Sequence, residues 1–207
     1  SPAISTAEDD GYLFRVVPSD AQQSVALADV VTSMGDSNPA VLFMTNDYGA
    51  GLGENFKAAM GSLCAEIGYD PTEGSYDAST LAQAVVDGGC DSVVLISYAT
   101  DGAAIMEELL SQGFSGSLYG ADGLADAALT QSFTDVAAVD GLVATKPRPG
   151  ESSTAKSSFE TAYAAAGGNA EGIYTNETFD AVNLVAAAAM ADSNDDLRDD
   201  LASLGSS

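Results

Sequence analysis

The sequence predicts an α/β fold, a three-layer arrangement in which a parallel sheet carries helices on both faces. Short apolar runs alternate with amphipathic helix patterns from residue 39 to residue 143. The apolar runs are continuous rather than alternating, which is typical of strands that are buried on both faces. Glycines such as Gly68 and Gly113 follow the helix patterns, where a left-handed residue closes a helix.

The expected elements follow one another in a regular order. They are a strand at 41–44, a helix at about 53–67, a helix around 81–86, a strand at 93–96, a helix at 103–110, a strand at 117–119, a helix near 125–133 and a strand at 141–145. Thr100 or Asp101 is expected to cap the helix that opens at Gly102. Two further helices, at 157–166 and 178–191, come without strands of their own.

The tract Lys-Pro-Arg-Pro-Gly at residues 146–150 interrupts this order. Proline lacks the N–H group that a central strand must donate, so the tract cannot continue the sheet. It is interpreted as a crossover or hinge, and it is the best internal boundary in the chain.

The composition excludes several classes of partner. The chain has 207 residues, of which 46% are hydrophobic, enough for a substantial core. Thirty-one acidic residues against six basic ones give a net charge of −25. Phosphate backbones and anionic lipid surfaces would repel such a surface, so nucleic acid is not expected as a partner. No apolar run reaches the roughly 18 residues of a membrane span, so direct membrane insertion is not expected.

The sequence offers few of the residues and motifs that catalysis commonly uses. The sequence contains no histidine, which removes the commonest general base and metal ligand. Residues 49–53 read Gly-Ala-Gly-Leu-Gly, which lacks the spacing and the lysine of a phosphate-binding loop, and a tight turn between strand and helix is the preferred interpretation. No cofactor, no metal site and no catalytic residue is therefore expected, and an enzyme is disfavoured.

The two cysteines, Cys64 and Cys90, are not part of a Cys-x-x-Cys pair. Cys64 is expected late in a helix and Cys90 just before a strand, two ends that can approach each other in an α/β layer. A disulfide and a pair of buried thiols both remain open, and a disulfide would indicate a periplasmic or extracellular compartment.

Polar and aromatic residues follow the expected strands. They are Asn46-Asp47-Tyr48, Tyr76-Asp77, Ser97-Tyr98 and Ala121-Asp122. The carboxyl ends of parallel strands share one edge, where α/β proteins bind small ligands. Tyr48, Tyr98 and Asp122 are therefore candidate ligand-binding residues. The alternative is that both tyrosines are packing residues and that Asp122 is a turn or cap residue.

Four segments resemble one known family in order and spacing. They are residues 14–15 with 18–22, residues 46–52 (Asn-Asp-Tyr-Gly-Ala-Gly-Leu), residues 120–123 (Gly-Ala-Asp-Gly) and residues 174–181 (Tyr-Thr-Asn-Glu-Thr-Phe-Asp-Ala). They resemble the type I periplasmic substrate-binding proteins of ABC importers, in the branch of the leucine/isoleucine/valine-binding proteins.

This resemblance implies two lobes that close on a ligand. Residues 1–17 would be a remnant of lobe 1 with the first crossover, residues 18–144 the α/β domain of lobe 2, and residues 145–207 the return crossover with helices of lobe 1. The first residues read as the interior of a domain, so we expect the sequence to begin partway along a longer gene product that is truncated here at both ends. Such a chain would carry about half of a binding site.

The resemblance also assigns roles to single residues. Tyr48 and Tyr98 would line the cleft, Asp122 would accept the ammonium group of the ligand, and Tyr174 would wall the side-chain pocket from lobe 1. It implies a periplasmic protein that captures an amino acid, with aliphatic or branched-chain side chains favoured, and delivers it to a membrane permease. The alternative function is the ligand-sensing domain of a receptor or regulator with the same fold. Sequence beyond the two ends would separate these alternatives.

Overall fold

The computed structural model describes residues 2–148, 150–170, 172–191 and 196–204. The chain divides into two compact units. The larger unit holds Ser19–Lys146 together with the residues through Ser5, and the smaller unit holds Thr6–Pro18 with the described residues from Pro147 onward. The second boundary falls inside the proline-rich tract, whereas the residues through Ser5 group with the larger unit rather than with their chain neighbours.

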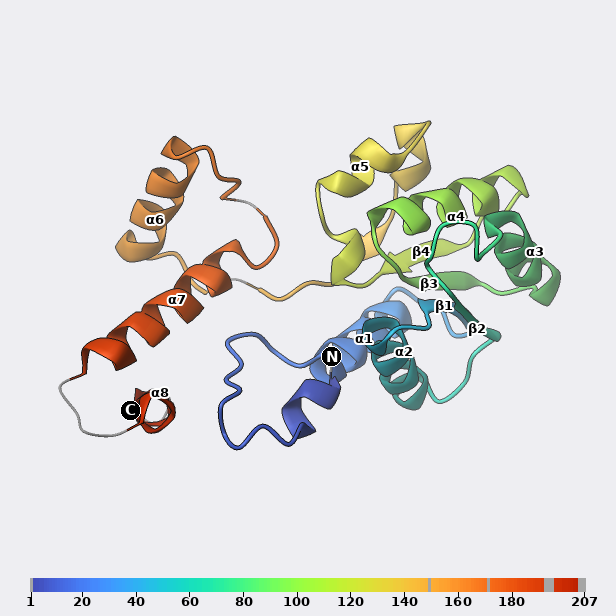
Figure 1. The fold of residues 1–207 in the computed structure, drawn as a ribbon. Coiled ribbons are helices and arrows are strands. Elements are labelled where there is room, and N and C mark those ends of the chain that lie inside the picture. The colour runs from blue at the N-terminus through green and yellow to red at the C-terminus, as the bar shows by residue number, and fades with distance from the viewer. Residues whose placement is uncertain (1, 149, 171, 192–195, 205–207) are drawn as a thin grey trace. The chain divides into compact units, whose positions relative to one another are not determined.

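A five-stranded sheet forms the centre of the larger unit (Figure 1). Its strands are β1 (Pro39–Met44), β2 (Ala65–Tyr69), β3 (Ser92–Ile96), β4 (Ser117–Gly120) and β5 (Val143–Ala144). The strand order is β2-β1-β3-β4-β5. Every neighbouring pair is parallel. The predicted parallel α/β sheet is thereby confirmed.

Helices cover both faces of this sheet, as predicted (Figure 1). The helices α1 (Asp20–Ser33) and α2 (Asp47–Met60) pack on one face, and α3 (Ala78–Gly88) and α4 (Ala99–Ser111) pack on the other. Successive residues of β1 serve opposite cores: Val41 joins the cluster beneath α1 and α2, and Leu42 joins the cluster beneath α3 and α4. Both side chains are fully buried, which explains why the strand is apolar without interruption.

The predicted helix at 53–67 is wrong at both ends. Helix α2 begins at Asp47 and ends at Met60, and Gly61 follows with φ of 73°. A left-handed residue ends a helix because the next N–H group turns back onto the last carbonyl groups. Residues 65–69 then form β2, an edge strand in which half-buried and exposed residues alternate. The sequence indicated only a weak second strand before Tyr76, and its position at 65–69 was missed because this segment lacks a continuous apolar run.

Three later elements also differ from prediction. Helix α4 begins at Ala99 rather than at Gly102. The helix expected near 125–133 is shorter, with a 3-10 turn at Asp122–Leu124 before α5 (Ala128–Ser132). The strand expected at 141–145 forms ladder pairs only at Val143 and Ala144, after a second 3-10 turn at Val136–Val139.

A disulfide joins Cys64 to Cys90, with 5.5 Å between the two Cα atoms. Cys64 directly precedes β2, and Cys90 follows the turn that ends α3. Cys64 therefore lies at the start of a strand and not late in a helix, as the sequence had predicted. The bridge fastens the edge strand to the helix that follows it in the chain.

The smaller unit contains α6 (Thr154–Ala165), α7 (Thr175–Met190) and α8 (Leu197–Leu204). Phe159 of α6 stacks on Phe179 of α7, with 4.0 Å between ring centroids. Among the described residues of this unit, only Ala188 is fully buried. Across the residues that the structure describes, no helix combines the length and the apolar character needed to cross a membrane.

Candidate functional site

Tyr48, Tyr98 and Asp122 lie together at the carboxyl edge of the sheet. They follow β1, β3 and β4, in the first turn of α2, at the N-cap of α4 and in the 3-10 turn after β4. The Tyr48 hydroxyl donates a hydrogen bond to Asp122 Oδ1 over 2.9 Å. The rings of Tyr48 and Tyr98 stack in parallel, with centroids 5.5 Å apart and planes 6° apart. The structure thus brings three of the four predicted site residues into one cluster, which we call the rim.

The start of α2 fixes the position of Tyr48. The Asn46 side chain caps the helix by accepting the N–H group of Gly49 over 2.9 Å. Gly49 itself presses against β1, since a Cβ atom there would lie 2.1 Å from the Met44 carbonyl oxygen. Only glycine permits so close an approach, and it sets the helix directly onto the strand end. The glycines at 49–53 therefore lie inside a helix and not in the predicted turn.

Gly123 brings the turn after β4 against the two tyrosines. Its N–H group donates to the Tyr48 hydroxyl over 3.2 Å. A Cβ atom at Gly123 would lie 2.4 Å from the Ser97 carbonyl oxygen and 3.1 Å from Cδ1 of Tyr98. The Tyr48 hydroxyl consequently accepts from Gly123 while it donates to Asp122.

The three rim residues differ in exposure. Asp122 is 8% exposed, whereas Tyr98 is 51% exposed and presents much of its ring to solvent. Burial, and secondly the neighbouring charge of Asp122, raise the pKa of Tyr48 far above its usual value. The Tyr48 hydroxyl therefore keeps its proton at neutral pH and remains a hydrogen-bond donor to Asp122.

A buried polar network lies directly behind the rim, and sequence reasoning missed it. It consists of Tyr69 at the end of β2, Ser97 after β3 and Asp101 in the first turn of α4. The Tyr69 hydroxyl donates to Asp101 Oδ2 and lies 2.7 Å from Ser97 Oγ. Asp101 Oδ1 accepts the backbone N–H group of Tyr98 over 3.1 Å. The carboxyl group of Asp101 thus reaches the backbone of a rim residue.

The sequence contains one pattern that could have indicated part of this network. An acidic residue three positions after an N-cap is a known helix-start pattern, and Asp101 stands in that relation to Tyr98. The sequence instead offered Asp101 as a cap for a helix opening at Gly102. Burial, and secondly the hydrogen bond to Asp101, raise the pKa of Tyr69 well above its usual value, so this hydroxyl also stays protonated.

Tyr174, the fourth predicted site residue, belongs to the smaller unit. It precedes α7 in the left-handed conformation, with φ of 64°, which is uncommon for a residue other than glycine. It lines an open hollow of about 310 Å³ that has an aromatic wall. The other lining residues are Phe159, Tyr163, Ile173, Thr175, Thr178, Phe179 and Val182.

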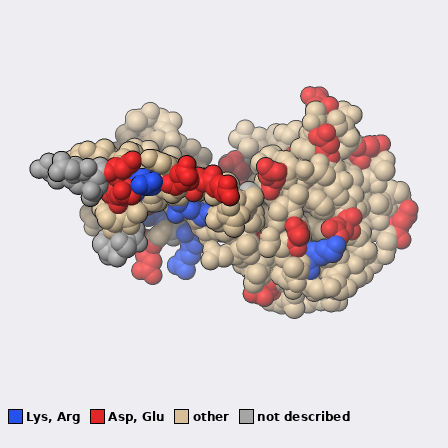
Figure 2. Space-filling view, turned by 60° about the horizontal axis from the view of Figure 1, so that its bottom comes forward, with Lys and Arg blue, Asp and Glu red and all other residues tan. Residues whose placement is uncertain are grey.

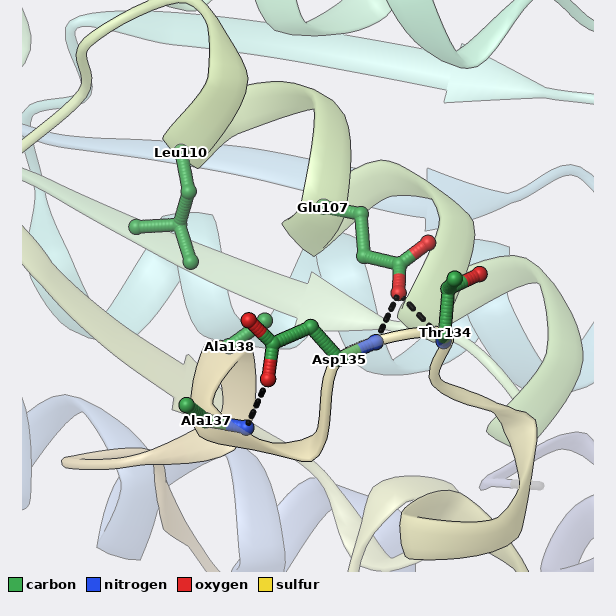
Figure 3. A pocket seen from close by; sticks show the side chains of 6 residues that line it. All are labelled: Glu107, Leu110, Thr134, Asp135, Ala137 and Ala138. Atoms are coloured by element: carbon green, nitrogen blue, oxygen red, sulfur yellow. Dashed lines mark hydrogen bonds between the residues drawn. The ribbon is translucent and has the colours of Figure 1, made fainter.

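A separate hollow of about 420 Å³ lies beside the middle of α4 (Figure 3). Its acidic side chains hold the backbone: Glu107 Oε1 accepts the N–H groups of Thr134 and Asp135 over 2.5 and 3.2 Å, and Asp135 Oδ1 accepts that of Ala137 over 3.0 Å. Glu107 is six residues beyond Asp101, roughly 9 Å further along the helix axis. We interpret these carboxyl groups as anchors of the loop rather than as ligand-binding groups.

The rim is suited to recognition of a small molecule. It offers one buried carboxyl group, a stacked pair of aromatic rings and hydrogen-bonding groups whose positions are fixed by backbone contacts. Within the described ranges, no group of three or more acidic or cysteine side chains could hold a metal ion. The chemistry available at the rim is therefore hydrogen bonding, charge pairing and apolar contact.

Comparison with known proteins adds independent information. A family model described as periplasmic binding protein matches residues 1–204. A Leu/Ile/Val-binding protein homologue of Brucella melitensis is 32% identical over 125 residues, which cover 58% of this chain and 34% of that protein. The chain thus spans about a third of the length of this curated relative.

Solved structures share the fold at lower identity. The leucine-binding protein of Thermotoga maritima is 24% identical, with a TM-score of 0.77 over 93% of this chain and 56% of that one. A branched-chain amino acid transporter substrate-binding protein of Streptococcus pneumoniae, solved with isoleucine, is 21% identical, with a TM-score of 0.74 over 92% of this chain and 56% of that one.

Proposed function

Because the chain belongs to the periplasmic binding protein family, we propose that it is the solute-binding component of an ABC importer and that it captures an amino acid. The named relatives support an aliphatic ligand, since the curated one is a Leu/Ile/Val-binding protein homologue and two solved ones are associated with leucine and isoleucine. In this proposal the captured amino acid is delivered to a membrane permease.

The observation that carries the proposal is the buried carboxyl group of Asp122, which accepts a hydrogen bond from one of two stacked tyrosines. A carboxylate that is largely removed from water pairs strongly with an ammonium group and poorly with a neutral ligand. The exposed face of Tyr98 supplies apolar contact for an aliphatic side chain. In this assignment Asp122 accepts the ammonium group, and Tyr48 orients Asp122 through its hydroxyl.

Tyr174 is assigned by the family resemblance alone. We propose that it walls the pocket for the ligand side chain, and its place in an aromatic hollow of the smaller unit is compatible with contact to apolar groups. Its left-handed backbone conformation also supports a role beyond packing, because residues in such sparsely populated conformations cluster at ligand-binding sites.

An extracytoplasmic location follows from the same proposal. The disulfide between Cys64 and Cys90 supports it, since disulfides persist in oxidising compartments such as the periplasm. The strongly acidic composition is compatible with a secreted binding protein and disfavours association with anionic lipid or nucleic acid.

Calorimetry with the protein from the complete reading frame tests the assignment of Asp122. We expect Asp122→Ala to weaken amino acid binding by about 2 to 5 kcal/mol, because the ligand ammonium would be buried without its partner. Asp126→Ala is the matched control, since this carboxyl group lies four residues further along and only caps the turn at Ala128. Equal affinity of the Asp122→Ala variant and the unaltered protein would remove Asp122 from the site.

A further inference from the structure

We propose that Asp101 is a positioning residue for the rim: it holds the backbone of Tyr98 so that the Tyr48–Tyr98 stack is already formed before a ligand binds. The inference rests on the proposed function insofar as the stack is part of a ligand site. Asp101 itself is buried and is not proposed to touch the ligand.

The contacts of Asp101 connect two segments that are distant in sequence, the end of β2 and the junction between β3 and α4. Its Oδ2 atom accepts the hydroxyl of Tyr69 at the end of β2, and its Oδ1 atom accepts the N–H group of Tyr98 at the start of α4. The Tyr69 hydroxyl also contacts Ser97 Oγ, which directly follows β3. One carboxyl group therefore links the end of β2 to Tyr98, the residue that carries the more exposed ring of the stack.

Burial distinguishes Asp101 from an ordinary helix cap. Asp77 caps the neighbouring helix α3 from an exposed position, where its Oδ1 atom accepts the N–H groups of Ser79 and Thr80. Asp101 is only 5% exposed. Removing a carboxyl group from water costs free energy unless every lost hydrogen bond is replaced. An exposed carboxyl group could cap the helix without this desolvation cost. The buried arrangement gives rigidity that an exposed cap does not.

Rigidity matters at Tyr98 because its ring is half exposed. A solvent-facing aromatic ring ordinarily samples several rotamers, and ordering it on binding costs conformational entropy. Here one edge of the ring lies against Gly123 and one face against Tyr48, while the backbone N–H group is held by Asp101. Fixing the backbone in advance removes that cost from the binding step.

Three substitutions separate positioning from simple stability. Asp101→Leu replaces both acceptor atoms with methyl groups on the same branched skeleton. Asp101→Asn keeps an oxygen for the Tyr98 N–H group and presents an amide to the Tyr69 hydroxyl, which can then donate to Ser97. Tyr69→Phe removes one partner of Asp101 without altering the start of α4.

The matched control is Asp91→Ala. Asp91 precedes the opposite end of β3 and accepts the N–H groups of Ser37 and Asn38 over 2.9 and 2.8 Å. Its loss removes two hydrogen bonds to the backbone just before β1, yet it leaves the rim untouched. Any effect common to Asp91→Ala and Asp101→Leu is therefore due to loss of stability alone.

Two measurements are made on the protein from the complete reading frame. Amide hydrogen exchange at Tyr98 in the ligand-free protein reports on the positioning directly, and calorimetry against leucine, isoleucine and valine reports on binding. We expect Asp101→Leu to accelerate exchange at Tyr98 by about tenfold or more and to weaken binding by a similar factor. Asp101→Asn is expected to restore both values to within about threefold, and Tyr69→Phe to fall between the two.

The results that overturn this proposal differ from those that overturn the proposed function. If Asp101→Leu and the Asp91→Ala control bind ligand equally well and exchange Tyr98 at equal rates, Asp101 is not a positioning residue. If Asp101→Leu does not fold, the Tyr69→Phe variant decides: a rate of amide exchange at Tyr98 equal to that of the unaltered protein overturns the proposal. If the unaltered protein binds none of the amino acids, the proposed function fails, while the exchange rates still decide whether Asp101 holds Tyr98.

Discussion

At the scale of single residues, the Tyr48 hydroxyl is the centre of the rim. It receives a hydrogen bond from the Gly123 backbone and gives one to Asp122, so its orientation is fixed from two sides. Its raised pKa, caused first by burial, keeps this direction of donation constant around neutral pH. Because the hydroxyl both donates and accepts a hydrogen bond, it holds Asp122 in one rotamer and reduces the entropy lost when a cation binds.

Substitution of Gly123 tests how closely the rim is packed. Gly123→Ala places a Cβ atom 2.4 Å from the Ser97 carbonyl oxygen, so the turn must move away from Tyr98 and Tyr48. We expect amino acid affinity to fall by about tenfold or more, which corresponds to roughly 1.4 kcal/mol. Titration calorimetry measures this change.

The control for that experiment is Gly150→Ala. No atom lies within 4 Å of a Cβ built at Gly150, so this variant should bind as the unaltered protein does. Full affinity in Gly123→Ala would show that the turn can shift without consequence and that the close packing is incidental to binding.

Sequence reasoning found all three rim residues for a simple reason. Tyr48, Tyr98 and Asp122 each follow a strand, and the ends of parallel strands converge whatever the details of packing. Asp101 and Tyr69 were not found, because their meeting depends on where α4 begins and on the existence of β2. The helix was expected to open three residues too late, at Gly102, and the weak second strand was expected before Tyr76 with residues up to 67 assigned to a helix.

At the scale of elements, β2 is a partly exposed edge strand. It lies at one edge, pairs only with β1, and exposes two of its five residues. Tyr69 at its end nevertheless supplies the hydroxyl that contacts Asp101. The disulfide from Cys64 to Cys90 secures the other end of the strand. The covalent bridge therefore supports the strand that reaches the back of the rim.

Removal of the disulfide should lower stability. The bond closes a loop with a sequence separation of 26 residues, and the chain-entropy model gives about 2 to 4 kcal/mol for such a loop. We expect the double variant Cys64→Ser/Cys90→Ser to unfold at a lower urea concentration than the oxidised protein. Adding reductant to the double variant is the control and should change nothing. Identical midpoints for the two proteins would show that β2 needs no covalent support.

The strands that were predicted well are the ones whose environment is uniform. β1 and β3 are buried on both faces, and a short continuous apolar run between turn residues is typical of such a buried strand. The glycines at 49–53 were predicted as a turn because glycine disfavours helices, yet they lie in α2. Tertiary packing outweighs propensity there, since Gly49 and Gly53 let the helix approach Met44 and Phe43 closely.

At the scale of the whole molecule, the charge is strongly negative. The net charge is −25, and carboxyl groups outnumber basic groups on the face drawn in Figure 2. Like charges repel across the folded surface and are farther apart in the unfolded chain, so the folded state carries the greater electrostatic cost. Few basic side chains are present to offset that repulsion.

Salt should therefore stabilise this protein. Raising NaCl from about 10 mM to about 1 M shortens the screening length from roughly 30 Å to roughly 3 Å. We expect the Tm to rise by several degrees, on the order of 5 °C, because a change of about 1 kcal/mol shifts the Tm of a chain of this size by a few degrees. Scanning calorimetry measures it, with sorbitol at equal osmolality as the control. A Tm that stays constant across this range would mean that the carboxyl groups are too widely spaced to repel.

One contact in the larger unit has a practical consequence. Gln23, in the second turn of α1, donates through Nε2 to the carbonyl oxygen of Thr145, which directly follows β5. The chain therefore comes into this unit and departs from it at adjacent points, with both cores and all five strands between them. A segment with neighbouring ends and its own interior can be excised, transplanted into a host loop or recloned with rearranged termini. Engineers could thus treat residues 19–146 as a detachable module for dissecting the rim in isolation.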